Sequence, residues 1–142
     1  MDLTGTIPSH LGNLSFLSSL DVRHNSFHGA LPIELTNLRR LKYLNFGNNN
    51  FDGEIPSWFG YFHELQDLWL YDNSFTGVIP STVGNLSKLE TLSLYENSLK
   101  GPIPSSIFNI SSLHRISLGH NNLFGYLSSN MFDYLPSLIT SS

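Results

Sequence analysis

The chain has 142 residues, of which 40% are hydrophobic and only 13% are charged, and this composition argues against an intrinsically disordered protein. Its formal charge of −4 and its seven scattered Lys and Arg residues provide no basic surface for nucleic acid. Because the chain contains no cysteine, disulfide bonds, thiolate metal sites and cysteine nucleophiles are excluded.

A 24-residue motif repeats along the chain, starting within an incomplete first unit. Its apolar-Pro pair occurs at Ile7-Pro8, Leu31-Pro32, Ile55-Pro56, Ile79-Pro80 and Ile103-Pro104. A glycine two positions earlier recurs as Gly5, Gly29, Gly53, Gly77 and Gly101. We therefore expect a single domain that consists of a partial repeat at 1–13, repeats at 14–37, 38–61, 62–85, 86–109 and 110–134, and a truncated repeat at 135–142.

Each unit predicts one short strand, a turn and an irregular or 3₁₀ return segment. In the unit 62–85, Leu68 and Leu70 are two positions apart, as in a strand with one buried face. Gly77 and Pro80 then exclude a long helix. One unit cannot bury its own leucines, whereas stacked units can, with their strands paired in parallel about 4.8 Å apart. The pattern therefore predicts an α/β solenoid, a right-handed coil with a short parallel sheet on its concave face.

Further residues recur at the same interval and have expected structural roles. Buried amides at the turn after each strand are expected to bond backbone groups of their own and of neighbouring units. These asparagines are Asn25, Asn49, Asn73, Asn97 and Asn121. An apolar column is expected from Phe27, Phe51, Phe75, Leu99 and Leu123. The recurring glycines are expected to provide a positive φ or a close backbone approach.

The residues that flank the strand leucines are expected to point to the concave side, where aromatic side chains gather in the middle units. We predict a ligand-binding face formed by Tyr43, Asn45, Asp67, Trp69, Tyr71, Thr91, Ser93, Tyr95 and Arg115. Because exposed Trp and Tyr dominate interface energetics, the functional interpretation is a peptide or protein lying across these strands. The alternative is that aromatic residues, which strands favour, merely shield the sheet. Tyr71 and Tyr95 are expected side by side on adjacent strands.

Acidic residues favour a ligand with a basic segment. Asp67, Asp72, Glu90 and Glu96 make the middle of the face mildly acidic. Three N-x-S/T sequons, at Asn13, Asn85 and Asn109, share one repeat phase in the return segment. If the protein is secreted, glycans at these asparagines would leave the concave face clear.

The histidines and serines form neither a metal site nor a catalytic centre in this arrangement. His24 and His120 share a phase but lie four strands apart, about 19 Å at normal strand spacing, so they cannot share an ion. His114 and His120 have no clustered carboxylate or thiolate beside them. No G-x-S-x-G elbow, P-loop or dinucleotide motif occurs. We therefore expect no enzymatic activity, no metal and no cofactor.

The spacing changes near the end of the chain. Leu135 and Leu138 follow Ile110 and Leu113 one position later than the repeat requires. We expect the strand that they should introduce to be missing from residues 139–142. The leucine core would then be open at both ends, and we expect marginal stability and self-association through the uncapped ends.

The phrase N-x-L/F-x-G-x-I/L-P in 24-residue units resembles the plant-type leucine-rich repeat of receptor-like kinases, receptor-like proteins and polygalacturonase-inhibiting proteins. Residues 5–15 (GTIPSHLGNLS) and 109–113 (NISSL) are similar to the flagellin- and elongation-factor-sensing receptor kinases. The resemblance implies a solenoid ectodomain with a peptide or protein ligand on its concave face. It also implies a co-receptor as a further partner, a role in extracellular signal or immune perception, and a parent protein on the outer side of the plasma membrane.

Complete ectodomains of this family have a signal peptide and cysteine-paired caps, and this sequence has neither. It also has no kinase motif and no stretch near the roughly 18 apolar residues of a membrane span. We therefore expect an internal piece of a larger receptor. The alternatives are an enzyme-binding module like the polygalacturonase inhibitors and a truncated product without a function of its own.

Overall fold

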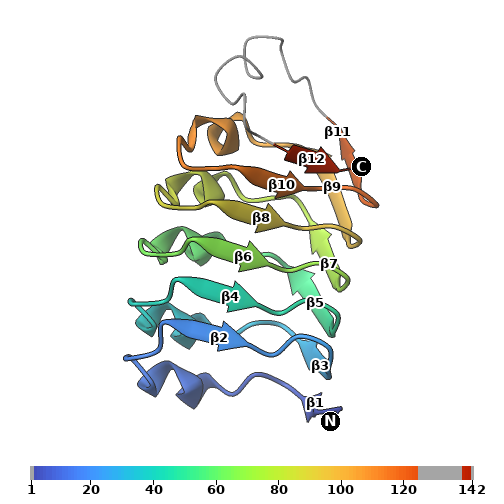
Figure 1. Cartoon of the computed structure of the whole chain (residues 1–142). Coiled ribbons are helices and arrows are strands. Elements are labelled where there is room, and N and C mark those ends of the chain that lie inside the picture. Colours follow the sequence, from blue (N-terminus) through green and yellow to red (C-terminus); the bar gives the residue numbers. More distant parts are fainter. Residues whose placement is uncertain (1, 125–138, 142) are drawn as a thin grey trace.

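Each coil of the solenoid contributes one strand to a parallel sheet, which we call the front sheet. The computed structural model describes residues 2–124 and 139–141. Within them, the front sheet has the order β12-β10-β8-β6-β4-β2 (Figure 1). Its strands are β2 (Ser19–Asp21), β4 (Tyr43–Asn45), β6 (Asp67–Trp69), β8 (Thr91–Ser93), β10 (Arg115–Ser117) and β12 (Ile139–Ser141). The predicted α/β solenoid with a parallel sheet is confirmed.

The register of the front sheet is the 24-residue interval of the sequence. Leu44 pairs with Leu68, and Leu68 with Leu92, so that equivalent positions stand in line across the strands. These leucines are fully buried. Because side chains alternate between the two faces of a strand, the residues on either side of each leucine belong to the outer face.

A second parallel sheet, which we call the side sheet, lies where the sequence predicts only an irregular segment. Its order is β1-β3-β5-β7-β9-β11 within the described residues. The strands are β1 (Thr4–Gly5), β3 (Ser26–Gly29), β5 (Asn50–Glu54), β7 (Ser74–Gly77), β9 (Ser98–Pro102) and β11 (Asn122–Phe124). In β5, Phe51 is buried between exposed Asn50 and Asp52. Such alternation is typical of a strand. The stretch between the recurring Asn and Gly of each repeat is too short for the sequence alone to reveal it.

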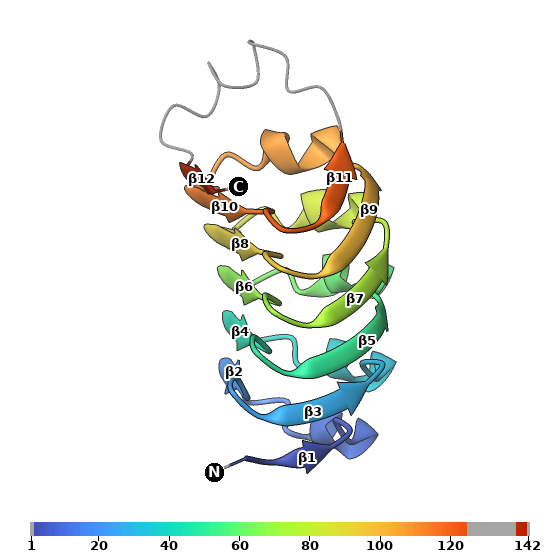
Figure 2. The ribbon, with the colours of Figure 1, turned by 90° about the vertical axis from the view of Figure 1, so that its right-hand side faces the viewer.

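The predicted 3₁₀ return segments are confirmed. They are η1 (Ser9–Asn13), η2 (Ile33–Asn37), η3 (Ser57–Tyr61), η4 (Ser81–Asn85) and η5 (Ser105–Asn109). An extended proline precedes each of them. Figure 2 shows these helices on the side of the coils opposite the front sheet, which we call the back. Within the described part of the chain, no helix has the length and apolar character needed to cross a membrane.

The expectation that the last strand is missing is wrong. Residues Ile139–Ser141 form β12, which pairs in parallel with β10, and Ile139 stands opposite Arg115. These two residues are one normal repeat apart, so the register is restored after the longer spacing that precedes it. Without β12, the outer edge of β10 would present unpaired backbone groups, and a short segment that contains Ile and Thr suits such an edge.

The aromatic column forms the centre of the core. Phe27, Phe51 and Phe75 stack in succession, with ring centroids 6.2 and 6.3 Å apart and nearly parallel planes. Phe51, Phe75 and Leu99 are fully buried, whereas Phe27 and Leu123 are half-buried. Burying one such ring contributes about 2 to 3 kcal/mol. The column therefore holds successive coils together.

The recurring asparagines connect the coils by hydrogen bonds. Asn73 Nδ2 donates to the carbonyl oxygens of Leu70 and Tyr71 in its own coil and to that of Phe46 in the preceding coil. Its Oδ1 accepts the backbone N–H of Phe51 at 3.0 Å. The Leu70 carbonyl accepts a second bond from Asn97 at 3.0 Å. Each asparagine thus shares acceptors with the next, and the bonds run continuously along the solenoid.

Two positions in each coil require a left-handed backbone. After the front strand, φ lies between 51° and 59° at His24, Asn48, Asp72, Glu96 and His120. In the side sheet, φ lies between 76° and 111° at Gly5, Gly29, Gly53, Gly77 and Gly101. The positive φ expected of the recurring glycines is confirmed. At the first position non-glycine side chains accept a conformation that costs them about 1 kcal/mol.

Candidate binding surface

The register of the front sheet brings together the residues predicted to bind a ligand. Tyr43, Asp67, Thr91 and Arg115 stand in one row, and Asn45, Trp69 and Ser93 stand in the next. Tyr71 and Tyr95 follow shortly after the ends of β6 and β8. All nine residues therefore belong to one continuous stretch of the front sheet and its adjoining turns.

Three of these nine residues are buried. Asn45, Thr91 and Ser93 are only 2%, 8% and 5% exposed. Their side chains are short and stand among larger ones, so a ligand on the surface cannot reach them. We call the remaining six residues the front patch. They are the exposed Arg115 and the half-buried Tyr43, Asp67, Trp69, Tyr71 and Tyr95.

Asn45 holds the hydroxyl group of Tyr43 in place. Its Nδ2 donates to Tyr43 Oη at 3.0 Å, and its Oδ1 accepts the backbone N–H of Gly47 at 2.9 Å. The same amide therefore fixes a tyrosine of the front patch and the turn that follows β4. This buried residue acts on the patch by positioning another side chain rather than by contacting a ligand.

Trp69 and Tyr71 form the centre of the front patch. Their ring centroids are 6.1 Å apart and their planes are nearly perpendicular. Such edge-to-face pairs contribute about 0.5 to 1.5 kcal/mol beyond their buried area. The Tyr71 ring lies on Gly47 in the preceding coil, in the space that a side chain at that position would occupy. The absence of a side chain at Gly47 therefore leaves room for the Tyr71 ring.

Tyr71 and Tyr95 occupy the same phase of adjacent coils but contact different neighbours. The Tyr95 ring is 4.9 Å from the His120 ring in an edge-to-face arrangement. Tyr71 thus turns towards the preceding coil, whereas Tyr95 turns towards the following one. The two rings therefore lie apart from each other within the patch.

The indole N–H of Trp69 has no acceptor. Among the described residues, Trp69 Nε1 is the buried side-chain nitrogen or oxygen atom without a hydrogen-bond partner. Leaving a buried donor unpaired costs about 1 to 3 kcal/mol. A carbonyl group of a ligand would remove this cost if the indole ring turned outward to meet it.

Burial raises the pKa of the Tyr71 hydroxyl above its ordinary value of 10.0. Nearby Tyr43, Asp21 and Asp72 raise this pKa further, and the positive charge of Arg23 opposes them. The hydroxyl group is therefore protonated at neutral pH and can donate a hydrogen bond to a ligand.

The acidic residues near the patch differ in their availability. The Asp72 carboxylate accepts a hydrogen bond from Asn48 Nδ2, whose Oδ1 also lies 3.2 Å from His24 Nδ1. Asp67 and Glu90 are half-buried, and Glu96 is exposed. Asp67 and Glu96 are thus open to a basic ligand group, whereas Asp72 already has a partner.

Substitution Gly47→Ala should displace the Tyr71 ring without unfolding the chain. The new Cβ would overlap the ring, while the backbone at this position does not need a positive φ. We expect a changed near-UV circular dichroism signal and an unchanged far-UV signal. Tyr71→Ala combined with Gly47→Ala is the control, because the added methyl group then meets no ring. An unchanged near-UV signal in the single variant would contradict this placement of Tyr71.

The three sequon asparagines lie on the back of the solenoid. Asn13, Asn85 and Asn109 are the last residues of η1, η4 and η5, and all three are exposed. The front sheet lies on the opposite side of each coil (Figure 2). A glycan at any of them would thus project away from the front patch.

Family models identify the repeat. Residues 63–123 match a family described as "Leucine rich repeat", and residues 16–38 and 40–62 match a second model of the same description. Together these matches extend over most of the described chain. No curated protein sequence matches the chain significantly.

Solved structures of plant receptors have the same fold. The ectodomain of the Arabidopsis thaliana membrane receptor kinase GASSHO1/SCHENGEN3, in complex with CASPARIAN STRIP INTEGRITY FACTOR 2, is 38% identical with a TM-score of 0.90. The match covers 98% of this chain and 17% of that one. The Arabidopsis receptor kinase HAESA, in complex with the peptide hormone IDA and the co-receptor SERK1, is 28% identical with a TM-score of 0.82, covering 99% and 25%. This chain thus spans a small part of the length of these receptors.

A shorter ectodomain matches over most of its length. That of the Arabidopsis thaliana receptor kinase SOBIR1 is 33% identical with a TM-score of 0.83, and the match covers 87% of this chain and 67% of that chain. The chain belongs to the plant-type leucine-rich-repeat family.

Proposed function

We propose that this chain is a peptide- or protein-binding segment of a plant receptor-like kinase ectodomain that takes part in extracellular signal or immune perception. The observation that carries the proposal is the front patch, where Trp69, Tyr71 and Tyr95 stand together on a rigid sheet. Tyrosine and tryptophan supply large contact areas with few rotatable bonds. GASSHO1/SCHENGEN3 and HAESA, which share the fold, are each described in complex with a ligand.

An extended peptide is the ligand that this surface suits best. The patch extends from β4 to β10 and combines four aromatic side chains with one acidic and one basic side chain. Asp67 and Glu96 would attract a basic ligand group, whereas Arg115 would bind an acidic group or a terminal carboxylate. The aromatic rings would contact apolar side chains between these charges.

Binding rather than catalysis is the proposed activity, and the partner would lie outside the cell. The half-buried aromatic patch provides contact area and hydrogen-bond donors. The parent protein would lie at the plasma membrane with this segment on the outer side, and a co-receptor would be its further partner. A membrane-span and kinase reading frame adjoining this coding sequence would support that assignment.

Two other functions would give different results in simple assays. An enzyme-binding module like the polygalacturonase inhibitors would inhibit a secreted polygalacturonase at stoichiometric concentration. A truncated product without a function of its own would neither inhibit this enzyme nor select peptides. The proposal expects peptide selection without inhibition.

Selection from a phage-displayed library of linear peptides tests the proposal. We expect the purified chain to enrich peptides that share aromatic and basic residues. The enriched peptides should bind the Tyr61→Ala variant as they bind the unchanged chain, because Tyr61 lies on the back. Enrichment of no peptide family, or equal enrichment by a Trp69→Ala variant, would contradict a role for the front patch.

A further inference from the structure

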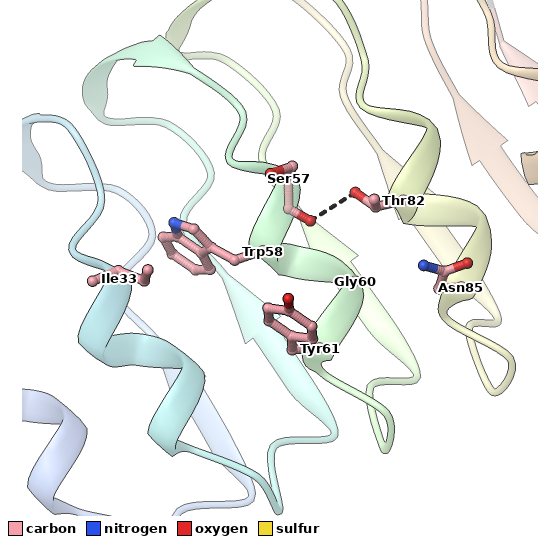
Figure 3. A pocket seen from close by; sticks show the side chains of 7 residues that line it. All are labelled: Ile33, Ser57, Trp58, Gly60, Tyr61, Thr82 and Asn85. Carbon is pink, nitrogen blue, oxygen red and sulfur yellow. Dashed lines mark hydrogen bonds between the residues drawn. The ribbon is translucent and has the colours of Figure 1, made fainter.

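The back of the solenoid has a groove that is separate from the front patch. The groove has a volume of about 360 Å³. It lies among η2, η3 and η4 and is lined by Ile33, Ser57, Trp58, Gly60, Tyr61, Thr82 and Asn85 (Figure 3). Tyr61 and Ile33 are 62% and 59% exposed, so their side chains are open to an occupant. The groove therefore presents an aromatic and aliphatic surface that suits an occupant with an apolar face.

The same groove contains an asparagine that can carry a sugar. Asn85 begins the sequon Asn85-Leu86-Ser87 and is the last residue of η4. Both Asn85 and Ser87 are exposed, and within the described residues no side-chain hydrogen bond engages the Asn85 amide. The Asn85 side chain is thus accessible from solvent.

Tyr61 stands directly beside this asparagine in the stack of coils. It precedes Asn85 by one full repeat, so the two residues hold the same position in adjacent coils. Figure 3 shows the Tyr61 ring between Trp58 and Asn85, with the amide of Asn85 at the rim of the groove. At a coil spacing of about 5 Å, the first sugar attached to the amide would reach the tyrosine ring.

The chemistry of the groove matches that of a pyranose. The C–H bonds on one face of a sugar ring carry partial positive charge and pack against the electron-rich face of an aromatic ring. The hydroxyl and acetamido groups at the sugar's edge need polar neighbours, and Ser57 and Thr82 line the groove. Thr82 Oγ1 already donates to the Ser57 carbonyl at 2.6 Å, so its lone pairs remain as acceptors.

We propose that Asn85 carries an N-linked glycan whose first N-acetylhexosamine lies on the Tyr61 ring and fills this groove. In the modification, Asn85 Nδ2 displaces the diphosphate from C1 of a lipid-diphosphate oligosaccharide. The N–C1 bond forms as the C1–O bond breaks, the amide proton passes to a base of the transferase, and the lipid diphosphate leaves. The inference rests on the proposed extracellular function, because such transfer takes place in the secretory pathway.

The sequon at Asn13 provides a matched comparison within the same chain. Asn13 and Asn109 hold the same phase as Asn85, but their neighbours in that column are Asn37 and Asn85. Neither has an aromatic residue in the preceding or following described coil at this position. A glycan at Asn13 would therefore extend into solvent, whereas the glycan at Asn85 would be held against the protein.

The rate at which a peptide N-glycosidase removes each glycan tests the proposal. The full chain, expressed with a secretion signal in cultured human cells, should be occupied at Asn85, as mass spectrometry of its peptides would show. Release from Asn85 under native conditions should be roughly 3- to 10-fold slower than release from Asn13, as expected for one sugar–aromatic contact. Tyr61→Ala should remove this difference, and Tyr61→Phe should retain it.

Either of two outcomes would overturn the proposal. One is an unmodified Asn85, and the other is an equal release rate from Asn85 in the unchanged chain and in Tyr61→Ala. Because the secretion signal is supplied, neither outcome depends on where the parent protein resides. Peptide binding by the same samples, measured separately, tests the proposed function, so failure of one inference is distinguishable from failure of the other.

Discussion

Replacing Asn73 by alanine is expected to lower the free energy of unfolding by about 3 kcal/mol. The substitution removes four hydrogen bonds, of which two lie within the third complete coil and two join it to the second. The Phe51 N–H loses its acceptor, and a void replaces the amide beside the Phe column. For a chain of this size such a loss lowers the melting temperature by roughly 10 °C, which thermal unfolding followed by circular dichroism would measure.

Asn50→Ala is the matched control for this prediction. Asn50 follows Asn49, the recurring asparagine of the neighbouring coil, and is exposed. Its substitution should change the melting temperature by roughly 1 °C or less, as is usual for surface positions. Equal effects of Asn50→Ala and Asn73→Ala would contradict the role of the recurring asparagines in joining the coils by hydrogen bonds.

A charged replacement separates the donor role of Asn73 from its volume. Asn73→Asp keeps an oxygen for the Phe51 N–H but turns a carboxylate towards the carbonyl oxygens of Phe46, Leu70 and Tyr71. We expect this variant to be less stable than Asn73→Ala at neutral pH and to regain stability in acid, where the carboxyl group is protonated.

Replacing both Trp69 and Tyr71 by alanine is expected to reduce the affinity for a selected peptide by roughly 100-fold or more. Aromatic side chains at the centre of an interface each contribute about 2 kcal/mol or more, and about 1.4 kcal/mol corresponds to a factor of ten. Because the two rings are in contact, their effects should not add fully. Isothermal titration calorimetry with a peptide from the library would measure the change.

The back of the molecule supplies the control for this second prediction. Trp58→Ala with Tyr61→Ala removes the same two side-chain types from the back, and it should leave peptide affinity unchanged within a factor of about two. Far-UV circular dichroism should show that both double variants are folded. A similar loss of affinity in both would indicate that stability, not the front patch, determines binding.

The sequence predicts the solenoid because its period is long and free of insertions over most of the chain. The apolar-Pro pair, the glycine and the asparagine each recur once per repeat, so that any one of them gives the same register. A parallel stack is the arrangement in which such units bury their leucines. The roles of the recurring asparagines and of the aromatic column follow from that register alone.

The sequence does not predict the side strands or β12, because their local patterns are weaker than the 24-residue repeat. The side strands have only a few residues each, and a single buried residue such as Phe51 carries their alternation. The restored register at Ile139 follows a segment of altered spacing, so the leucine positions alone misplace β12. In both cases the strand is stabilised by hydrogen bonds to a neighbouring strand, and the local sequence pattern does not reveal them.

Exposure within the front face also depends on neighbours from other coils. Ser93 and Thr91 have the phase of surface residues but are buried. On the back, likewise, Trp58 and Tyr61 form a groove with Asn85 only because the neighbouring coil places that asparagine beside them. The period predicts the face on which a residue lies, whereas the size of the residues one repeat away decides whether it is accessible.

Hydrogen–deuterium exchange of the chain with and without a selected peptide tests the central claim most directly. We expect slower exchange in residues 43–47, 67–71 and 91–95 of the front strands and their turns, and unchanged exchange in the back helices at residues 57–61 and 81–85. Protection confined to the back helices, or to the side strands, would contradict the assignment of the front patch as the binding surface.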